Sequence, residues 1–230
     1  MRTPKIAVGL ASLALVLAAC SSESDADSDA SAETATASAE ETTTEEAASV
    51  DVIKIGSIHP LTGGLAADGL QMDAGAQLAA ADINAAGGIS CLDGAQIEIL
   101  SADSTGTPEV GQSEAERLIQ EGVIALVGPY QSAVASNIAT VAERNGIPFV
   151  IDVAVADEIL TQGYTNTFRI QPNASAMGSQ GAKFLKELTD AEGIEVSKIA
   201  MLHEQSAFGT SVYEAFKTAA EANGWTVDPV

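Results

Sequence analysis

The stretch VIALVGPYQS, residues 123–132, decides the fold class of this chain. It opens with an uninterrupted apolar run, which is typical of a strand covered on both faces of a parallel sheet. Gly128 and Pro129 end the strand, and a helix is predicted to follow from Ser132 to Asn145. A strand that passes through a short turn into a helix is the repeating half of a βαβ unit. The stretch therefore predicts an α/β fold.

Strand and helix patterns alternate in both directions from this stretch. In a helix predicted at 69–86, apolar residues that include Leu70, Leu78 and Ile83 recur at helical spacing. This order indicates right-handed βαβ units and doubly wound parallel sheets. The other predicted strands are 52–58, 96–101, 147–153, 198–203 and 225–227, and the other helices are 108–121, 174–191 and 209–223.

A restart of the pattern around residues 165–172 divides the globular part into two lobes. We expect a first α/β lobe at 51–168 and the start of a second α/β lobe at 169–230. The strand at 225–227 has no helix after it, which leaves a βαβ unit unfinished. We therefore expect the second lobe to be incomplete in this chain, as in a fragment or a truncated gene product.

The first twenty residues predict a signal peptide. Arg2 and Lys5 precede the largely apolar run 6–19, which spans only about 21 Å as a helix and is short for a bilayer core of about 30 Å. Small residues lead into Cys20 and resemble the lipobox of bacterial lipoproteins, which implies that Cys20 is acylated and becomes the new N-terminus. An ordinary signal peptide with a chance cysteine is the alternative. We expect an extracytoplasmic protein that is lipid-anchored to the bacterial cell membrane.

The segment 21–50 predicts a disordered linker. Its first 29 residues consist of Ser, Ala, Thr, Glu and Asp alone, so they bury too little apolar surface to offset the entropy of ordering. An acidic tail that binds cations is the alternative. The whole chain has a net charge of −22, which argues against nucleic acid or anionic lipid as a partner, because both require a basic surface.

Signals for catalysis are absent from the sequence. His59 and His203 are the only histidines, and neither belongs to a metal-ligand spacing. No nucleophile elbow, Walker loop or dinucleotide fingerprint is present, and Cys91 has no nearby base. We therefore predict no catalytic residue, no metal and no cofactor, and the chain is not expected to be an enzyme.

A family resemblance rests on five short motifs in a fixed order. Together they resemble the branched-chain amino-acid-type (Leu/Ile/Val-binding) substrate-binding proteins of ABC importers, which have the type I periplasmic binding fold. The resemblance implies two lobes with a ligand cleft between them. The motifs are IGSIHPLTG at 55–63, DINAAGGI at 82–89, VGP at 127–129, GIP at 146–148 and TFR at 167–169.

Ligand-binding residues are expected where strands lead into helices, because helix N-termini there offer unpaired N–H groups. Ser132 lies at such a point, and the resemblance implies that it binds the carboxylate of the ligand; a plain helix N-cap is the alternative. The resemblance also places Ala154 as a backbone contact and Ala156 where a hydroxyl is expected. Tyr130, just before Ser132, is a further candidate.

Two other candidates depart from the family pattern. Phe208 stands where the resemblance implies a tyrosine that packs on the ligand, with a core phenylalanine as the alternative. Asp68 stands where an aromatic residue is common, with a plain surface aspartate as the alternative.

The combined interpretation is a solute receptor that captures a small polar ligand by cleft closure and delivers it to ABC permease and ATPase subunits. An amino acid, an organic or aromatic acid and an amide all remain open as the ligand. A ligand-sensing surface receptor without a transport role is the alternative, and a secreted hydrolase is a third hypothesis.

Overall fold

The computed structural model describes residues 51–229. The predicted signal peptide at 1–20, with Cys20, and the whole of the predicted linker at 21–50 therefore lie outside the described residues. Within the described part, no helix is long and apolar enough to cross a membrane.

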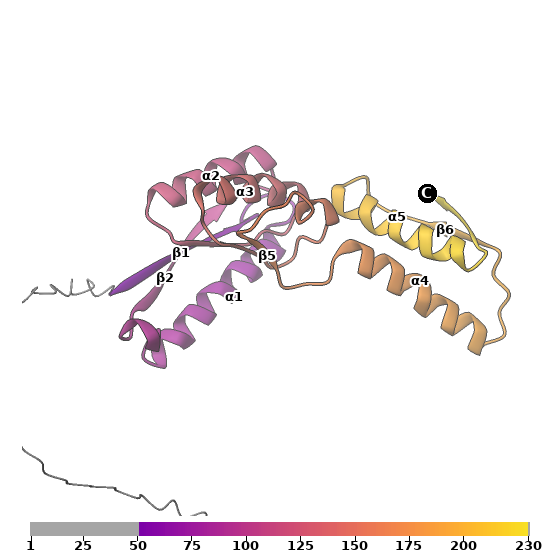
Figure 1. Cartoon of the computed structure of the whole chain (residues 1–230), viewed down its shortest axis with the longest axis horizontal. Coiled ribbons are helices and arrows are strands. Elements are labelled where there is room, and N and C mark those ends of the chain that lie inside the picture. Colours follow the sequence, from indigo (N-terminus) through magenta and orange to yellow (C-terminus); the bar gives the residue numbers. More distant parts are fainter. Residues whose placement is uncertain (1–50, 230) are drawn as a thin grey trace, which may run out of the picture. The chain divides into compact units, whose positions relative to one another are not determined.

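The first sheet has five parallel strands in the order β2-β1-β3-β4-β5 (Figure 1). Parallel strands bring all their carboxyl ends to one edge, where ligands of open α/β sheets bind. The prediction of an α/β fold with a parallel sheet is confirmed. The strands are β1 (Val52–His59), β2 (Gln96–Asp103), β3 (Ala125–Val127), β4 (Phe149–Ile151) and β5 (Thr167–Arg169).

Helices cover the two faces of this sheet unequally. Neighbouring residues of β1 show the two faces, because Ser57 contacts α1 through Asp73 whereas a side chain on Gly56 would meet Leu118 of α2. In Figure 1, α1 lies on one side of the strands, and α2 and α3 lie on the other. The helices are α1 (Ala66–Ala85), α2 (Pro108–Gln120) and α3 (Ser132–Asn145), with short 3₁₀ turns η1 (Ser90–Leu92) and η2 (Asp157–Ile159).

The main core lies between the sheet and the pair α2–α3. Gly111 brings these two helices together, since a Cβ atom there would lie 2.5 Å from Val134. The largest side chains of this core are almost wholly excluded from solvent. They are Ile58, Leu118, Leu126, Ile138, Phe149, Ile151 and Ile159.

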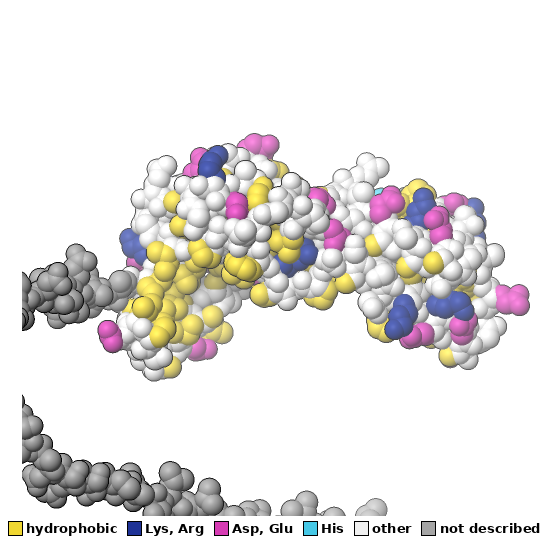
Figure 2. Space-filling view, in the orientation of Figure 1, with side chains coloured by type: hydrophobic (Ala, Val, Ile, Leu, Met, Phe, Trp, Pro, Cys, Tyr) yellow, Lys and Arg dark blue, Asp and Glu magenta, His cyan; other side chains and the backbone are white. Residues whose placement is uncertain are grey.

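The larger apolar side chains of α1 are not part of this core. Leu70 and Leu78 are 54% and 62% exposed, and the helix buries only Gly69 and Ala80. A Cβ atom on Gly69 would lie 2.1 Å from the carbonyl oxygen of Pro60, so α1 approaches the sheet through its small residues. Its larger side chains remain on a surface that no described element covers, where Figure 2 shows hydrophobic side chains gathered.

A second, two-stranded parallel sheet follows, made of β6 (Lys198–Met201) and β7 (Thr226–Pro229). The helices α4 (Ala174–Ala191) and α5 (Ala207–Ala222) pack on each other. Gly178 permits this close packing, because a Cβ atom there would lie 2.5 Å from the backbone oxygen of Val212. The small core of this part consists of Ala182, Tyr213, Ala220, Trp225 and Val227.

Candidate functional site

The carboxyl edge of the first sheet brings together residues that are distant in the chain. His59 ends β1, Asp103 ends β2, Gly128 follows β3, Asp152 follows β4 and Arg169 ends β5. Three of the predicted ligand-binding residues, Ser132, Ala154 and Ala156, belong to the segments that follow β3 and β4 at this edge.

Ser132 contacts the loop after β4 rather than capping its own helix. Its side chain is almost fully buried, and its Oγ atom accepts a hydrogen bond from the backbone N–H of Ala156 at 3.2 Å. Gln131 occupies the N-cap position of α3, so the alternative of Ser132 as a plain N-cap is not what the structure shows. The N–H of Ala154 in turn donates to the carbonyl oxygen of Pro129 at 3.2 Å. The geometry thus joins Ser132, Ala154 and Ala156.

Arg169 holds the same loop from the β5 side. Its Nη1 atom donates to the carbonyl oxygen of Ala156 at 3.0 Å. Burial lowers the pKa of the Arg169 guanidinium from its ordinary value, and the nearby charge of Asp157 acts in the opposite direction. The motif TFR drew attention to this arginine but carried no role for it; the role needs the contact with Ala156, which the sequence does not display.

The other three candidates are not joined to Ser132 by any hydrogen bond found in residues 51–229. Asp68 is exposed in the first turn of α1, and Tyr130 is half-buried. Phe208 is 42% exposed near the start of α5, and its neighbour Ala207 packs against the core of the first sheet. Phe208 is therefore not a core residue, and its predicted place at the ligand stays a prediction.

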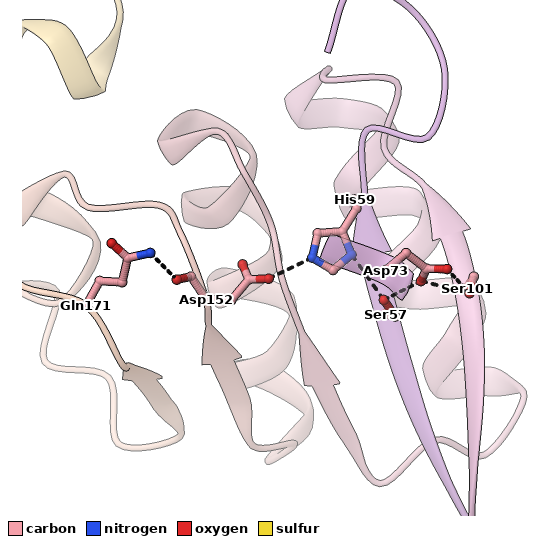
Figure 3. Close-up of polar contacts among 6 residues, drawn as sticks. All are labelled: Ser57, His59, Asp73, Ser101, Asp152 and Gln171. Carbon is pink, nitrogen blue, oxygen red and sulfur yellow. Dashed lines mark hydrogen bonds and ion pairs between the residues drawn. The ribbon is translucent and has the colours of Figure 1, made fainter. Parts of the chain in front are cut away.

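A buried histidine forms a polar bridge across the sheet, and the sequence did not reveal it (Figure 3). His59 is 1% exposed. Its Nδ1 atom lies 3.0 Å from Ser57 Oγ, and its Nε2 atom lies 2.8 Å from Asp152 Oδ2. The only sequence signal was that Ser57 and His59 alternate on one strand and so share a face.

The bridge continues on both sides of the histidine (Figure 3). Ser57 Oγ donates to Asp73 Oδ1 at 2.6 Å, and Ser101 Oγ also donates to the carboxylate of Asp73. On the other side, the side-chain amide of Gln171 donates to the carbonyl oxygen of Asp152 at 2.8 Å. The second carboxylate oxygen of Asp152, Oδ1, is buried and has no hydrogen-bond partner among the described residues.

Gly128 makes the bridge sterically feasible. His59 and Asp152 extend from β1 and β4, which lie on either side of β3 in the sheet. A Cβ atom on Gly128, just beyond β3, would lie 3.3 Å from His59 Nε2 and 2.2 Å from the carbonyl oxygen of Ile58. Its φ of 121° is in any case a conformation that favours glycine.

Asp103 fixes the loop that follows β1. Its carboxylate accepts hydrogen bonds from the N–H of Leu61 at 2.8 Å, from the hydroxyl of Thr62 at 2.6 Å and from the N–H of Thr105 at 2.8 Å. Burial alone would raise the pKa of Asp103, but the hydrogen bonds from Thr62, Thr105 and Leu61 together hold that pKa below its ordinary value. The carboxylate thereby ties the PLTG segment of the first motif to the end of β2.

The surface grooves are not lined by the residues that end the strands at this edge. A groove of about 690 Å³ is lined by α4, α5 and Asp157, and another of about 360 Å³ lies at the amino ends of β1 and β3. Neither groove is lined by Ser132 or by the segment 153–156. No group of three or more His, Cys, Asp or Glu side chains that could hold a metal ion is found among residues 51–229.

Comparison with known proteins gives a family match over nearly the whole described part. The family described as "Periplasmic binding protein" matches residues 52–230. Leu/Ile/Val-binding protein BraC3 of Rhizobium johnstonii is 34% identical over 175 residues, which cover 76% of this chain and 45% of that protein. Leu/Ile/Val-binding protein homolog 8 of Brucella suis is 36% identical over 190 residues, which cover 81% of this chain and 46% of that protein. The chain thus spans less than half the length of these curated relatives.

Solved structures share the fold. The branched-chain amino acid transporter substrate-binding protein LivJ from Streptococcus pneumoniae, in complex with isoleucine, is 29% identical with a TM-score of 0.68; the match covers 77% of this chain and 49% of that one. A leucine-binding protein from Thermotoga maritima is 24% identical with a TM-score of 0.67. This match covers 77% of this chain and 48% of the Thermotoga chain. The resemblance drawn from the five motifs is confirmed, and these relatives are named as binding proteins rather than as enzymes.

Proposed function

The chain belongs to the periplasmic binding protein family, and on that premise we propose that it is an extracytoplasmic solute-binding lipoprotein of an ABC importer. It captures a small polar ligand in a cleft between a first lobe, 51–168, and a second lobe that begins at 169. Contacts with the ligand from both lobes shift an open–closed equilibrium toward the closed form. The importer's permease and ATPase subunits are the proposed partners, and acylated Cys20 is the proposed membrane anchor.

The arrangement of Ser132 and Ala156 is the observation that carries this proposal. The N–H of Ala156 donates to Ser132 Oγ, so the Ser132 hydroxyl still has its own hydrogen to donate. A hydroxyl that accepts one hydrogen bond while donating another is polarised, which strengthens the bond that it donates. Ser132 is also the first residue of α3, where the helix dipole favours negative charge.

This chemistry fits the acidic end of a small ligand. The curated relatives are named for leucine, isoleucine and valine, each of which carries a carboxylate. We assign the Ser132 hydroxyl to that carboxylate. We assign the loop with Ala154 and Ala156 to holding this hydroxyl in place, since the N–H groups of both alanines already donate to other groups of the protein. Tyr130, Asp68 and Phe208 are assigned to the walls of the cleft, where they contact the rest of the ligand.

A binding screen tests the proposal. Thermal unfolding of the protein is measured with L-leucine, L-isoleucine and L-valine, and with two acids that lack an amino group, 4-methylpentanoate and benzoate. At least one compound should raise the unfolding temperature by mass action and bind in a calorimetric titration. The absence of binding to every compound that carries a carboxylate would overturn the assignment of Ser132.

A further inference from the structure

The loop 153–156 is bonded on two sides. The N–H of Ala156 donates to Ser132, the first residue of α3. From the other side, the N–H of Ala174 donates to the carbonyl oxygen of Val155 at 2.8 Å. Ala174 is the first residue of α4, and it is fully buried. The loop is therefore bonded to the first turns of two helices.

Asp157 makes the larger part of the connection to α4. It directly follows the loop, and both of its carboxylate oxygens are used. Oδ2 accepts hydrogen bonds from the backbone N–H of Ser175 at 2.9 Å and from the Ser175 hydroxyl at 2.8 Å, and Oδ1 accepts one from the side-chain amide of Asn173. The dipole of α4 also favours a negative charge at this end of the helix. The carboxylate thus ties the end of the loop to the first turn of α4.

The first sheet holds Asp157 as well. Asp157 begins the turn η2, and the last residue of that turn, Ile159, is 1% exposed and belongs to the main core. Burial lowers the pKa of Arg169, the charge of Asp157 opposes this effect, and the guanidinium donates to the carbonyl oxygen of Ala156. Because Asp157 and Ala156 share a peptide unit, a displacement of the carboxylate is passed directly to the loop.

We propose that Asp157 is a positioning residue for the proposed ligand-binding site: by holding the first turn of α4, it keeps the N–H of Ala156 on Ser132 Oγ and so fixes the direction in which that hydroxyl donates. A carboxylate that merely capped α4 would have no effect on Ala156. The inference rests on the proposed function for the ligand that Ser132 binds. The state of the Ala156 N–H can be measured without any ligand.

Amide hydrogen exchange of the full chain, followed by NMR, tests the inference. In Asp157→Ala the N–H of Ser175 loses its acceptor and should exchange faster. The N–H of Ala156 should also exchange about 10-fold faster or more, because hydrogen bonds to a charged group no longer oppose local opening of the loop. Faster exchange at Ser175 with unchanged exchange at Ala156 would overturn the inference.

Ser206→Ala is the matched control. The Ser206 side chain caps α5 by accepting from the N–H of Gly209 at 3.1 Å, and no hydrogen bond found in residues 51–229 joins it to the loop 153–156. This variant should speed the exchange of Gly209 and leave Ala156 unchanged. An equal effect of Ser206→Ala and Asp157→Ala on Ala156 would indicate general loosening and would also overturn the inference.

A pair of changes tests the connection while α4 stays capped. Asn173 caps α4 by accepting from the N–H of Ala176 at 2.9 Å, and aspartate is an equally good cap. Asn173→Asp alone places two carboxylates against each other, so Ala156 should exchange faster while Ala176 stays protected. Adding Asp157→Asn supplies an amide that donates across the same contact, and the protection of Ala156 should recover. Protection that ignores the first change, or does not recover with the second, would contradict the role of Asp157.

A calorimetric titration with L-leucine tests the consequence for binding. Asp157→Ala should bind several-fold more weakly than the unmodified chain, whereas Ser206→Ala should bind equally well. Equal affinity in all three proteins would overturn the connection to binding. If L-leucine does not bind to the unmodified chain, its assignment as a ligand fails, and the exchange of Ala156 still decides the role of Asp157.

Discussion

The Oγ atom of Ser132 lies 3.2 Å from the backbone nitrogen of Ala156, and this hydrogen bond joins the helix after β3 to the loop after β4. The two residues are 24 positions apart in the chain. The contact makes Ser132 a structural link as well as a proposed ligand contact. Substitution of this serine should therefore change both binding and folding.

We predict that Ser132→Ala weakens ligand binding about 10- to 150-fold, because one hydrogen bond to a charged group contributes about 1.5–3 kcal/mol. The variant also leaves the Ala156 N–H without its acceptor, which should lower the free energy of unfolding by about 1–3 kcal/mol. Calorimetric titration and urea unfolding measure the two effects. Ser136→Ala is the control, since Ser136 Oγ bonds only to the backbone oxygen of Ser132. Unchanged affinity in Ser132→Ala would leave the serine with a purely structural role.

Gly128→Ala should be far more destabilising than a matched change at Gly122. Both glycines have positive φ, 121° and 86°, so alanine is strained at either position. A Cβ atom on Gly122 meets nothing within 4 Å, whereas one on Gly128 would lie 2.2 Å from a backbone oxygen. Urea unfolding should show a loss of about 1 kcal/mol for Gly122→Ala and at least twice as much for Gly128→Ala. Equal losses would mean that the steric contact around Gly128 is unimportant.

The loop after β1 should depend on the ionisation of Asp103. Its pKa is lower in the folded protein than the ordinary value of 3.8, so it adds stability above that value and loses it as pH falls through the folded pKa. We expect the free energy of unfolding of the unmodified chain to fall more steeply below about pH 4 than that of Asp103→Asn. Asp93→Asn should keep the steep dependence. Parallel pH profiles for the chain and Asp103→Asn would contradict the role of this carboxylate.

Membrane attachment should depend on one of the two cysteines. Cys20→Ala removes the acylation site that the lipobox resemblance implies, and the protein should move from the membrane to the soluble fraction. Cys91→Ala, which alters an exposed thiol in the described part, should leave attachment unchanged. Cell fractionation followed by a salt wash is the measurement. A Cys20→Ala protein that stays in the washed membrane would point to a different anchor.

The sequence predicted elements well where local pattern and end signals agree. The helices α3 and α4 have the predicted bounds, since a glycine follows Asn145 and Asn173 caps α4 through the N–H of Ala176. The strand β5 was not predicted, because three residues show no alternation and its pairing with β4 is long-range. The apolar spacing in α1 predicted the helix but not the exposure of its larger side chains, because periodicity gives the face of a helix and not what covers it.

Part of the candidate site could likewise not be predicted from the sequence. The link between Ser132 and the loop 154–156 could be expected from the family pattern. The bridge from His59 to Asp152 could not, because it requires the strand order β1-β3-β4 and a missing side chain at Gly128. A local pattern of residues predicts neither the order of the strands in the sheet nor the free space next to Gly128.

The strand order also has a consequence for how this chain could acquire new ligands. From β1 the chain crosses to β2 on one side and then returns to β3 on the other, so a topological switch point lies between β1 and β3. The loops that leave these two strands diverge there to opposite faces. Their residues can therefore be exchanged without altering a single strand pair, and the buried bridge from His59 to Asp152 keeps the strand ends beneath them in place.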